Sequence, residues 1–139
     1  MSGILLVRDI MVRNVKTVRT DDTVLEAVSK MNKFRIGSVI VTNNGRPVGI
    51  ITERNILQRI VEPCLDPAVV RAKDIMSSPL ITIDANAAVE EAAQIMARRQ
   101  IKKLPVVEGG KIVGILSTSD IVRTSPTQLS ILEELLRVR

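Results

Sequence analysis

The sequence contains no histidine, tryptophan or tyrosine, and only one phenylalanine and one cysteine among 139 residues. Without histidine, Ser-His-Asp and Cys-His catalytic arrangements and histidine-based metal sites are excluded. The single Cys64 excludes an internal disulfide and a cysteine metal cluster. Neither a glycine-rich phosphate loop nor an acidic cluster with metal-ligand spacing is present. We therefore predict a protein that is not an enzyme and that uses no catalytic cofactor or metal.

Long apolar runs are also missing. No run approaches the roughly 18 residues that a membrane span requires, and the N-terminal MSGILLVRDIM lacks the basic start and apolar length of a signal peptide. We therefore expect a cytoplasmic protein with no membrane partner. Apolar residues still make up 45% of the chain, nearly all of them aliphatic. This is enough for one ordinary domain, or for two small units that share a core.

What the chain does contain is an internal repeat. A shift of 65 residues aligns Val7–Leu57 with Ala72–Val122 without a gap, and 15 of the 51 aligned positions are identical. Asp-Ile-Met and Val-Gly-Ile each occur once in both copies. Self-similarity at one fixed spacing indicates a duplication. We predict a first domain at 1–62, a linker at 63–71, a second domain at 72–125 and a C-terminal helix at 126–139.

Each copy is predicted to fold as β-α-β-β-α, which places the chain in the α/β (α+β) class. Apolar spacing and turn residues give the elements. In the first copy these are strand Asn14–Arg19, helix Thr23–Phe34, strands Ser38–Thr42 and Val48–Thr52, and a helix from Glu53. In the second copy they are strand Leu80–Ile83, helix Ala87–Arg99, strands Leu104–Glu108 and Ile112–Ser117, and a helix from Thr118.

Two further features of the sequence support the predicted order of strands and helices. Asn44-Gly45 and Gly109-Gly110 tolerate the positive φ values of a tight hairpin, so each copy should contain an antiparallel strand pair. The C-terminal helix should carry one apolar face, formed by Leu129, Leu132, Leu135 and Leu136. A packing or dimer face is the expected role of such a leucine stripe.

Two polar pairs stand where a strand becomes a helix. Thr52 precedes Asn55 by three residues, and Ser117 precedes Asp120 by the same spacing, which puts the Cβ atoms of each pair roughly 5–6 Å apart. A helix start offers amides and a positive dipole end to an anion, and the acid or amide can bind a ribose diol. Helix capping is the alternative, because Ser and Thr are common caps. Both interpretations stay open at this point.

Taken in order, the motifs resemble the cystathionine β-synthase (CBS) domain. They are Asp-Ile-Met, Val-x-Glu-Ala, Ile-x-x-Leu/Val-x-Val and Val-Gly-Ile-x-Thr/Ser-x-x-Asn/Asp-Ile, and both copies match. The resemblance implies a tandem pair packed through its sheets, called a Bateman module, that forms a homodimeric disc of four CBS domains. It also implies clefts between the copies that bind AMP, ADP, ATP or S-adenosylmethionine. Such a regulatory, energy-sensing module would signal to a separate effector protein.

The resemblance also assigns roles to residues. Asn55 and Asp120 would hold ribose hydroxyls, and Thr52 and Ser117 would face phosphate or ribose. The remaining assignments are Ile50 and Ile115 beside the base, backbone at Lys16, Thr17, Ile81 and Thr82 against the adenine edge, Lys102 and Lys103 at the Asn55 cleft, and Gly37 and Ser38 at the Asp120 cleft. The family often has Asp where this chain has Asn55. For the two lysines, a solvated end of a helix-to-strand loop is the alternative interpretation.

The charge balance keeps a second function open. The formal net charge is +5 and the sequence pI is about 9.9, as in many nucleic-acid-binding proteins. Against this, the basic residues are spread over both copies and aromatic residues for base stacking are nearly absent. A basic nucleic-acid-binding protein or a structural dimer with empty clefts is therefore the alternative to the nucleotide-binding module.

Overall fold

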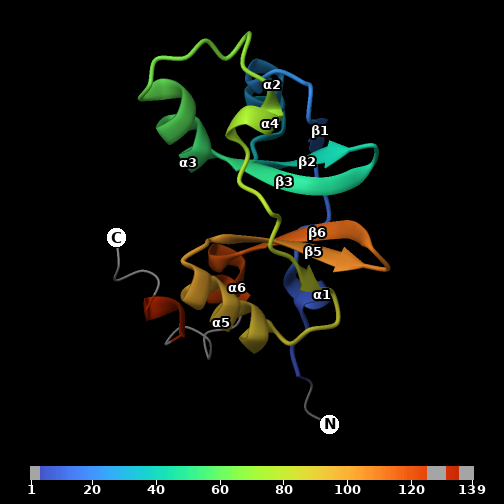
Figure 1. Cartoon of the computed structure of the whole chain (residues 1–139). Coiled ribbons are helices and arrows are strands. Elements are labelled where there is room, and N and C mark those ends of the chain that lie inside the picture. Colours follow the sequence, from blue (N-terminus) through green and yellow to red (C-terminus); the bar gives the residue numbers. More distant parts are fainter. Residues whose placement is uncertain (1–3, 125–130, 135–139) are drawn as a thin grey trace. The chain divides into compact units, whose positions relative to one another are not determined.

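The first repeat forms a three-stranded mixed sheet with the order β1-β2-β3. Strand β1 (Thr17–Arg19) is parallel to β2 (Ser38–Asn43), and β2 is antiparallel to β3 (Arg46–Thr52). Asn44 and Gly45 adopt φ values of 53° and 80°, so the hairpin predicted from the Asn-Gly pair is confirmed. The computed structural model describes residues 4–124 and 131–134 of the chain, and Figure 1 shows its elements.

Helix α2 (Val24–Phe34) packs against this sheet. Thr23 caps it: the hydroxyl of Thr23 accepts a hydrogen bond from the amide of Glu26 at 3.1 Å, and the Glu26 carboxylate accepts from the amide of Thr23 at 3.2 Å. This reciprocal pair satisfies two amides that a helix start leaves free. The apolar residues Val24, Ala27 and Met31 are buried, as their helical spacing predicts. The short helix α3 (Glu53–Ile56) follows β3 and continues as the π-helix η1 (Leu57–Val61).

The second repeat repeats this arrangement. Its sheet has the order β4-β5-β6, from strands Ile83–Asp84, Lys103–Glu108 and Lys111–Ser117. Helix α5 (Val89–Arg99) follows β4, and α6 (Thr118–Thr124) follows β6. The α/β class and the β-α-β-β-α order predicted for both copies are confirmed. The first strand is shorter than predicted, because only Ile83 and Asp84 pair with β5.

The two short helices α1 (Val7–Ile10) and α4 (Ala72–Ile75) end on the Asp-Ile of each Asp-Ile-Met motif, with the methionine as the C-cap, and were not predicted. Each belongs to the compact unit of the other repeat. One unit is Val15–Leu80, and the other is Met1–Asn14 together with Ile81–Arg139. We call them the Asn55 unit and the Asp120 unit, after the polar residue near the end of β3 or β6. The compact units therefore do not coincide with the sequence repeats.

Residues 7–12 and residues 72–77 each belong to the unit of the other repeat, and we call them the exchanged segments. Each of them pairs with the last strand of the sheet in that unit. In the Asp120 unit, Val12 and Ile115 exchange two backbone hydrogen bonds of 2.9 Å. In the Asn55 unit, Ile50 and Ser77 do the same at 3.1 and 2.8 Å. The glycine of each Val-Gly-Ile motif makes room for this crossing. A Cβ on Gly114 would lie 2.6 Å from Met11 Sδ and 2.9 Å from the Val12 carbonyl oxygen.

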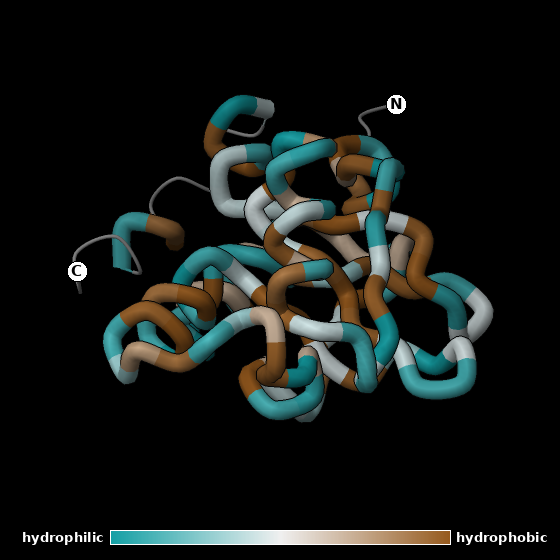
Figure 2. The backbone as a smooth tube through the Cα atoms, turned by 90° about the horizontal axis from the view of Figure 1, so that it is seen from above, coloured by the Kyte–Doolittle hydropathy of each residue, from teal (hydrophilic) through white to brown (hydrophobic). Residues whose placement is uncertain are grey.

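Each unit has its own aliphatic core. The core of the Asn55 unit includes Val18, Val24, Ala27, Met31, Val39, Val41, Ile51, Ile60, Ala72 and Ile75. The core of the Asp120 unit includes Val7, Met11, Ile83, Val89, Ala92, Met96, Leu104, Val106, Leu116, Ile121 and Leu132. Figure 2 shows the alternation of apolar and polar residues along the backbone that this burial requires. None of the helices in the described ranges has the length and apolar character needed to cross a bilayer.

The predicted C-terminal helix can be followed only in part. Residues 131–134 are helical, and Leu132 is fully buried in the core of the Asp120 unit. Leu129, Leu135 and Leu136 lie outside the described residues. The packing role expected of the leucine stripe is therefore confirmed for Leu132.

Candidate functional site

In the Asn55 unit, the predicted site residues meet at one end of the sheet. Strands β1 and β2 begin at this end and β3 finishes there, since Ser38 pairs with Thr52. The carbonyl of Lys16 accepts from the amide of Ile40 at 3.0 Å, and the carbonyl of Gly37 accepts from the amide of Glu53 at 3.2 Å. The structure therefore brings together the site residues Lys16, Thr17, Gly37, Ser38, Ile50, Thr52 and Asn55.

The Asp120 unit has the same arrangement. Lys103 pairs with Ser117 across the sheet, and the carbonyl of Lys102 accepts from the amide of Thr118 at 3.1 Å. Ile81 and Thr82 precede β4, which runs parallel to β5, so they lie toward this end as well. The set here is Ile81, Thr82, Lys102, Lys103, Ile115, Ser117 and Asp120. Lys102 is exposed and Lys103 is half-buried.

Thr52 and Asn55 form a helix cap. The Thr52 hydroxyl accepts from the Asn55 amide at 3.2 Å, and the Thr52 amide donates to Asn55 Oδ1 at 3.0 Å. The capping interpretation is therefore correct for this pair. Asn55 Nδ2 donates to Ser77 Oγ at 3.1 Å, which ties the side chain to the exchanged segment. Within the described part of the chain, the Thr52 hydroxyl proton has no acceptor, so it remains available to a ligand.

Ser117 and Asp120 form the corresponding cap with more bonds. Asp120 Oδ2 accepts from the Ser117 amide at 2.9 Å and from the Ser117 hydroxyl at 2.8 Å. The Ser117 hydroxyl in turn accepts from the Asp120 amide at 3.2 Å. Arg123 Nη2 donates to Asp120 Oδ1 at 2.6 Å and forms an ion pair with it. The position that matches Ser77 is Val12, which has no side-chain donor or acceptor.

Burial singles out these residues from the other polar side chains. Among the described residues, the buried polar or charged ones are Ser38, Asn55, Ser117 and Asp120, each at most 8% exposed. All four are predicted site residues. A buried polar group is costly unless it is hydrogen-bonded, and the caps supply these bonds for Asn55, Ser117 and Asp120.

The start of β1 carries contacts that the sequence did not suggest. Lys16 Nζ lies 4.2 Å from the ring centroid of Phe34, a cation–π contact. Lys30 Nζ donates to the carbonyl of Thr17 at 2.7 Å, so this backbone oxygen already has a partner. Position 95, which matches Lys30, is isoleucine. The resemblance places the backbone at Lys16 and Thr17 of one unit, and at Ile81 and Thr82 of the other, against adenine. The side chains around these two backbone segments therefore differ between the units.

Three contributors were missed by sequence reasoning: Ser77, Lys30 and Arg123. Ser77 lies 22 residues from Asn55 in the sequence, and only the exchange of the Asp-Ile-Met segment brings it there. Arg123 could have been found, because it follows Asp120 by three residues on a helix, a spacing at which side chains meet. The alignment of the two repeats did not point to Arg123, because the position that matches it is Gln58.

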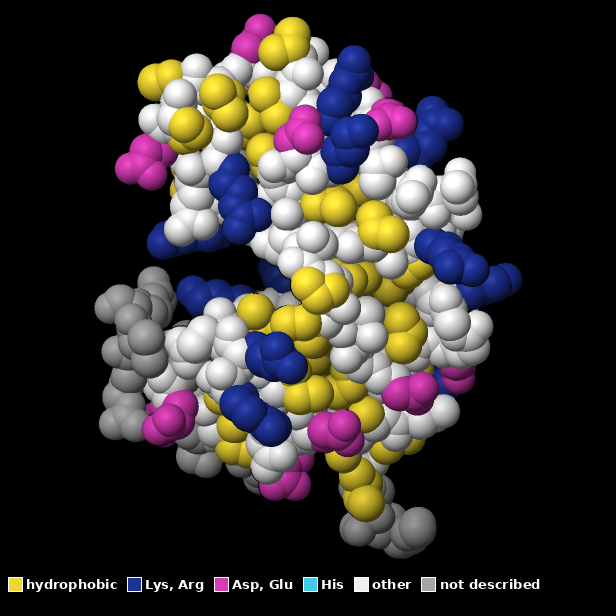
Figure 3. All heavy atoms as spheres, viewed as in Figure 1, with side chains coloured by type: hydrophobic (Ala, Val, Ile, Leu, Met, Phe, Trp, Pro, Cys, Tyr) yellow, Lys and Arg dark blue, Asp and Glu magenta, His cyan; other side chains and the backbone are white. Residues whose placement is uncertain are grey.

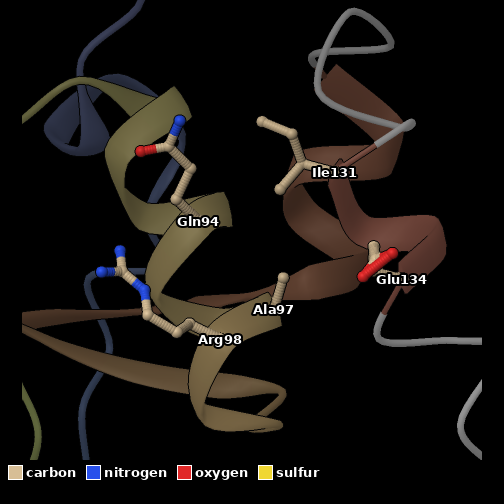
Figure 4. A pocket seen from close by; sticks show the side chains of 5 residues that line it. All are labelled: Gln94, Ala97, Arg98, Ile131 and Glu134. Carbon is tan, nitrogen blue, oxygen red and sulfur yellow. The ribbon is translucent and has the colours of Figure 1, made fainter.

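A hollow in the Asp120 unit lies between α5 and residues 131–134. Gln94, Ala97 and Arg98 of α5 face Ile131 and Glu134 across it (Figure 4). None of its lining residues belongs to the predicted site. The described residues also contain no group of three or more Asp, Glu, Cys or His side chains placed to hold a metal ion.

On the face shown in Figure 3, the Lys and Arg side chains are dispersed among uncharged and acidic ones. Within neither unit do they form a continuous basic stripe on this face. A nucleic-acid surface would gather its cations along one face. This view therefore lends no support to the nucleic-acid alternative.

Comparison with known proteins gives a consistent result. The profile of the CBS domain matches residues 7–62 and 72–126. An uncharacterized protein of Methanopyrus kandleri is 38% identical over 124 residues, which cover 88% of this chain and 63% of that protein. The CBS domain-containing protein YhcV of Bacillus subtilis is 33% identical over 115 residues, covering 83% of this chain and 81% of YhcV. This chain thus spans less than two thirds of the Methanopyrus protein.

A solved structure shows the same fold. The hexameric CBS-CP12 protein from bloom-forming cyanobacteria superimposes with a TM-score of 0.84 at 32% sequence identity. The match covers 89% of this chain and 70% of the cyanobacterial chain.

Proposed function

The chain belongs to the CBS-domain family, with a tandem pair of CBS domains, and from this premise we propose that it is a non-catalytic regulatory module that binds an adenosine-containing ligand. The ligand contacts the sheet ends that carry Thr52 with Asn55 and Ser117 with Asp120. Its occupancy is passed to a separate effector protein. Paired CBS domains are generally regulatory, and AMP, ADP, ATP and S-adenosylmethionine are the candidate ligands.

The burial of Ser38, Asn55, Ser117 and Asp120 carries this proposal. These four residues are the buried polar ones of the described chain, and all lie at the sheet ends where the resemblance places the ligand. A helix cap does not need buried residues, as Thr23 and Glu26 of α2 show with their exposed hydrogen bonds. Polar groups concentrated and buried at one end of each sheet are typical of a binding site.

The chemistry of the Asn55 unit fits a nucleoside. Thr52 has a free hydroxyl proton to donate, and Asn55 offers an amide that both donates and accepts. Ile50 is half-buried beside them on β3, where its side chain can pack against a base. These groups can bind ribose and adenine without a charged side chain.

A thermal-shift screen tests the proposal. Ligand-free protein is melted with AMP, ADP, ATP, S-adenosylmethionine and the guanine nucleotides as controls. A ligand that binds only the folded state at a hundredfold excess over its Kd adds about 2.7 kcal/mol to the free energy of unfolding. A shift with at least one adenine compound is expected. If no adenine compound raises the melting temperature, the proposal is wrong.

We also propose that the module self-associates, at least to a homodimer. The segment in and after η1 exposes Leu57, Val61, Leu65 and Val69, each between 47% and 66% accessible. Several exposed apolar side chains in one segment are typical of an interface. The related CBS-CP12 protein is hexameric. Light scattering should give a mass of at least twice 15.3 kDa, and a monomer at micromolar concentration with and without nucleotide would refute this.

A further inference from the structure

One of the two exchanged segments is held by two side chains of a single helix. Arg59 Nη1 donates to the carbonyl oxygens of Ile75 and Met76 at 2.8 and 3.2 Å. Asn55 Nδ2 donates to Ser77 Oγ at 3.1 Å. Asn55 and Arg59 stand four residues apart in the continuous helix formed by α3 and η1, so their side chains lie on the same side of it. We call these two side chains, with the three residues that they hold, the clasp.

The bonds from Arg59 fix the end of a helix. Ile75 is the last residue of α4 and Met76 is its C-cap, so their carbonyl oxygens have no partner within that helix. The guanidinium supplies one, and hydrogen bonds from a charged donor are stronger than those between neutral groups. Arg59 therefore makes the stronger attachment to the exchanged segment, and Asn55 makes the weaker one.

The clasp contacts the candidate site at two points. Asn55 is itself a predicted site residue, and Ser77 exchanges two backbone hydrogen bonds of 3.1 and 2.8 Å with Ile50, which the resemblance places beside the base. The Asn55 amide accepts one bond from Thr52 and donates one to Ser77, which leaves one N–H and one lone pair for a ribose. Because hydrogen bonds in a chain strengthen one another, a ligand that binds this amide strengthens its hold on Ser77.

The chain carries this constraint directly into the Asp120 unit. Three residues follow Ser77, and the next two are Ile81 and Thr82, which belong to the Asp120 unit and lead into β4. The resemblance places the backbone of these two residues against adenine. Three residues give the chain little slack, since each spans at most about 3.6 Å. The position of Ser77 therefore limits where Ile81 can lie.

The other exchanged segment has no such clasp. The positions that match Ser77 and Arg59 are Val12 and Thr124. Valine offers no side-chain hydrogen bond, and the Thr124 hydroxyl donates to a carbonyl of its own helix. Within the described ranges, no side chain of α6 hydrogen-bonds to this exchanged segment. The coupling that a clasp allows therefore runs through the connection that follows Ser77.

We propose that Arg59 and Ser77 couple the two candidate sites. A ligand in the Asn55 unit tightens the clasp, and the clasp orders residues 78–82, which carry the backbone that meets adenine in the Asp120 unit. Arg59 is a positioning residue, because it acts through the exchanged segment. This inference rests on the proposed function, since an adenosine-containing ligand must occupy the sites. Coupling of this kind is reciprocal, so a ligand in the Asp120 unit tightens the clasp by the same factor.

Hydrogen exchange of the full chain, followed by mass spectrometry, tests this with AMP, ADP, ATP and S-adenosylmethionine as probes. The ligand must occupy the Asn55 unit alone, so that protection in the other unit reports transmission and not direct contact. Asp120→Ala removes the ribose contact of the second site, and Ile115→Arg blocks its base position if the first background does not fold. Calorimetry confirms that one ligand binds, and circular dichroism confirms that each protein is folded.

The variants placed in this background are Arg59→Gln, Arg59→Lys and Ser77→Ala. The matched control is Lys73→Gln, which breaks the ion pair with Asp21 at the start of the same exchanged segment. It weakens the attachment of that segment without touching the clasp. The measured quantity is the ratio of exchange rates without and with ligand for the amides of residues 80–84.

Ligand in the Asn55 unit should slow the exchange of these amides by about fivefold or more, the lower end of usual coupling factors. In Arg59→Gln and in Ser77→Ala the ratio should fall below about twofold. Arg59→Lys should keep part of the protection, because an ammonium can still donate to one of the two carbonyls. Lys73→Gln should keep all of it. A merely structural role of Arg59 would speed exchange equally with and without ligand and leave the ratio unchanged.

Each failure has its own meaning. If a probe binds but residues 80–84 exchange at the same rate, the coupling is wrong and the proposed function stands. If protection survives in both Arg59→Gln and Ser77→Ala, the clasp is not the route and the inference is overturned. An equal loss in Lys73→Gln would show that any weakening of the segment suffices, which overturns the specific roles of Arg59 and Ser77. If none of the four probes binds the native chain, the proposed function fails and the coupling fails with it.

Discussion

The glycine of the Val-Gly-Ile motif should be intolerant of even one added carbon. A Cβ on Gly114 would lie 2.6 Å from Met11 Sδ, 2.9 Å from Met11 Cγ and 2.9 Å from the carbonyl oxygen of Val12. The methionine side chain can move, but the carbonyl belongs to a backbone segment that hydrogen-bonds twice to Ile115. Gly114→Ala should therefore push the exchanged segment away from β6.

The magnitude follows from three contributions. Overpacking a core typically costs about 1–3 kcal/mol, and weakening two hydrogen bonds costs about 0.5–1.5 kcal/mol each. Replacing glycine restricts the unfolded chain, which offsets about 0.4–1 kcal/mol. Together these ranges give about 1–5.6 kcal/mol, and we expect Gly114→Ala to lower the free energy of unfolding by an amount near the middle, about 2–4 kcal/mol. With an m-value of about 2 kcal/mol/M, the urea midpoint would fall by about 1–2 M.

Urea denaturation followed by circular dichroism measures the effect, and a double-mutant cycle tests its cause. In a Met11→Ala background, Gly114→Ala should cost about 1 kcal/mol less, because part of the clash is gone. Gly45→Ala is the control for additivity: its φ of 80° strains an alanine, but no atom lies within 4 Å of the added Cβ, so its cost should be additive with Met11→Ala. A change below about 0.5 kcal/mol for Gly114→Ala, or an additive cycle with Met11→Ala, would refute this reasoning.

Two further substitutions test smaller features of the units by urea denaturation. Ser77→Ala removes the acceptor of Asn55 Nδ2 and should cost about 0.5–1.5 kcal/mol; unchanged stability would show that this bond contributes nothing net. Leu132→Ala truncates a fully buried side chain and should cost about 2–5 kcal/mol. A loss below about 1 kcal/mol would contradict the placement of Leu132 in the core.

Local sequence signals predicted most of the secondary structure. The helical spacing of Val24, Ala27 and Met31 marked α2, and Asn44-Gly45 marked the first hairpin. Both signals act within a few residues, where propensity and turn chemistry dominate. The two polar pairs were also found, because a strand-to-helix junction has a fixed local geometry, and both the capping and burial of these residues are visible in the structure.

The sequence did not reveal which repeat each Asp-Ile-Met segment would join. The repeat places Met11 with the first copy and Met76 with the second, yet each packs on the glycine of the other copy's last strand. A duplication makes the two partners nearly equivalent, so residue type cannot distinguish them. The bond between Asn55 and Ser77 depends on this exchange and was unpredictable for the same reason.

The exchange sets an order in which the chain can fold during synthesis. The Asn55 unit uses only residues 15–80, so it can close once this stretch has left the ribosome, with the second half still unmade. Residues 5–12, which contribute Val7 and Met11 to the other core, pair with residues 85–89 and with Ile115 of β6, so they have no native partner until the second half of the chain emerges. This segment is thus made before the Asn55 unit but reaches its final place after it, and separating the gene into its two sequence repeats would leave each half without the segment that covers its sheet.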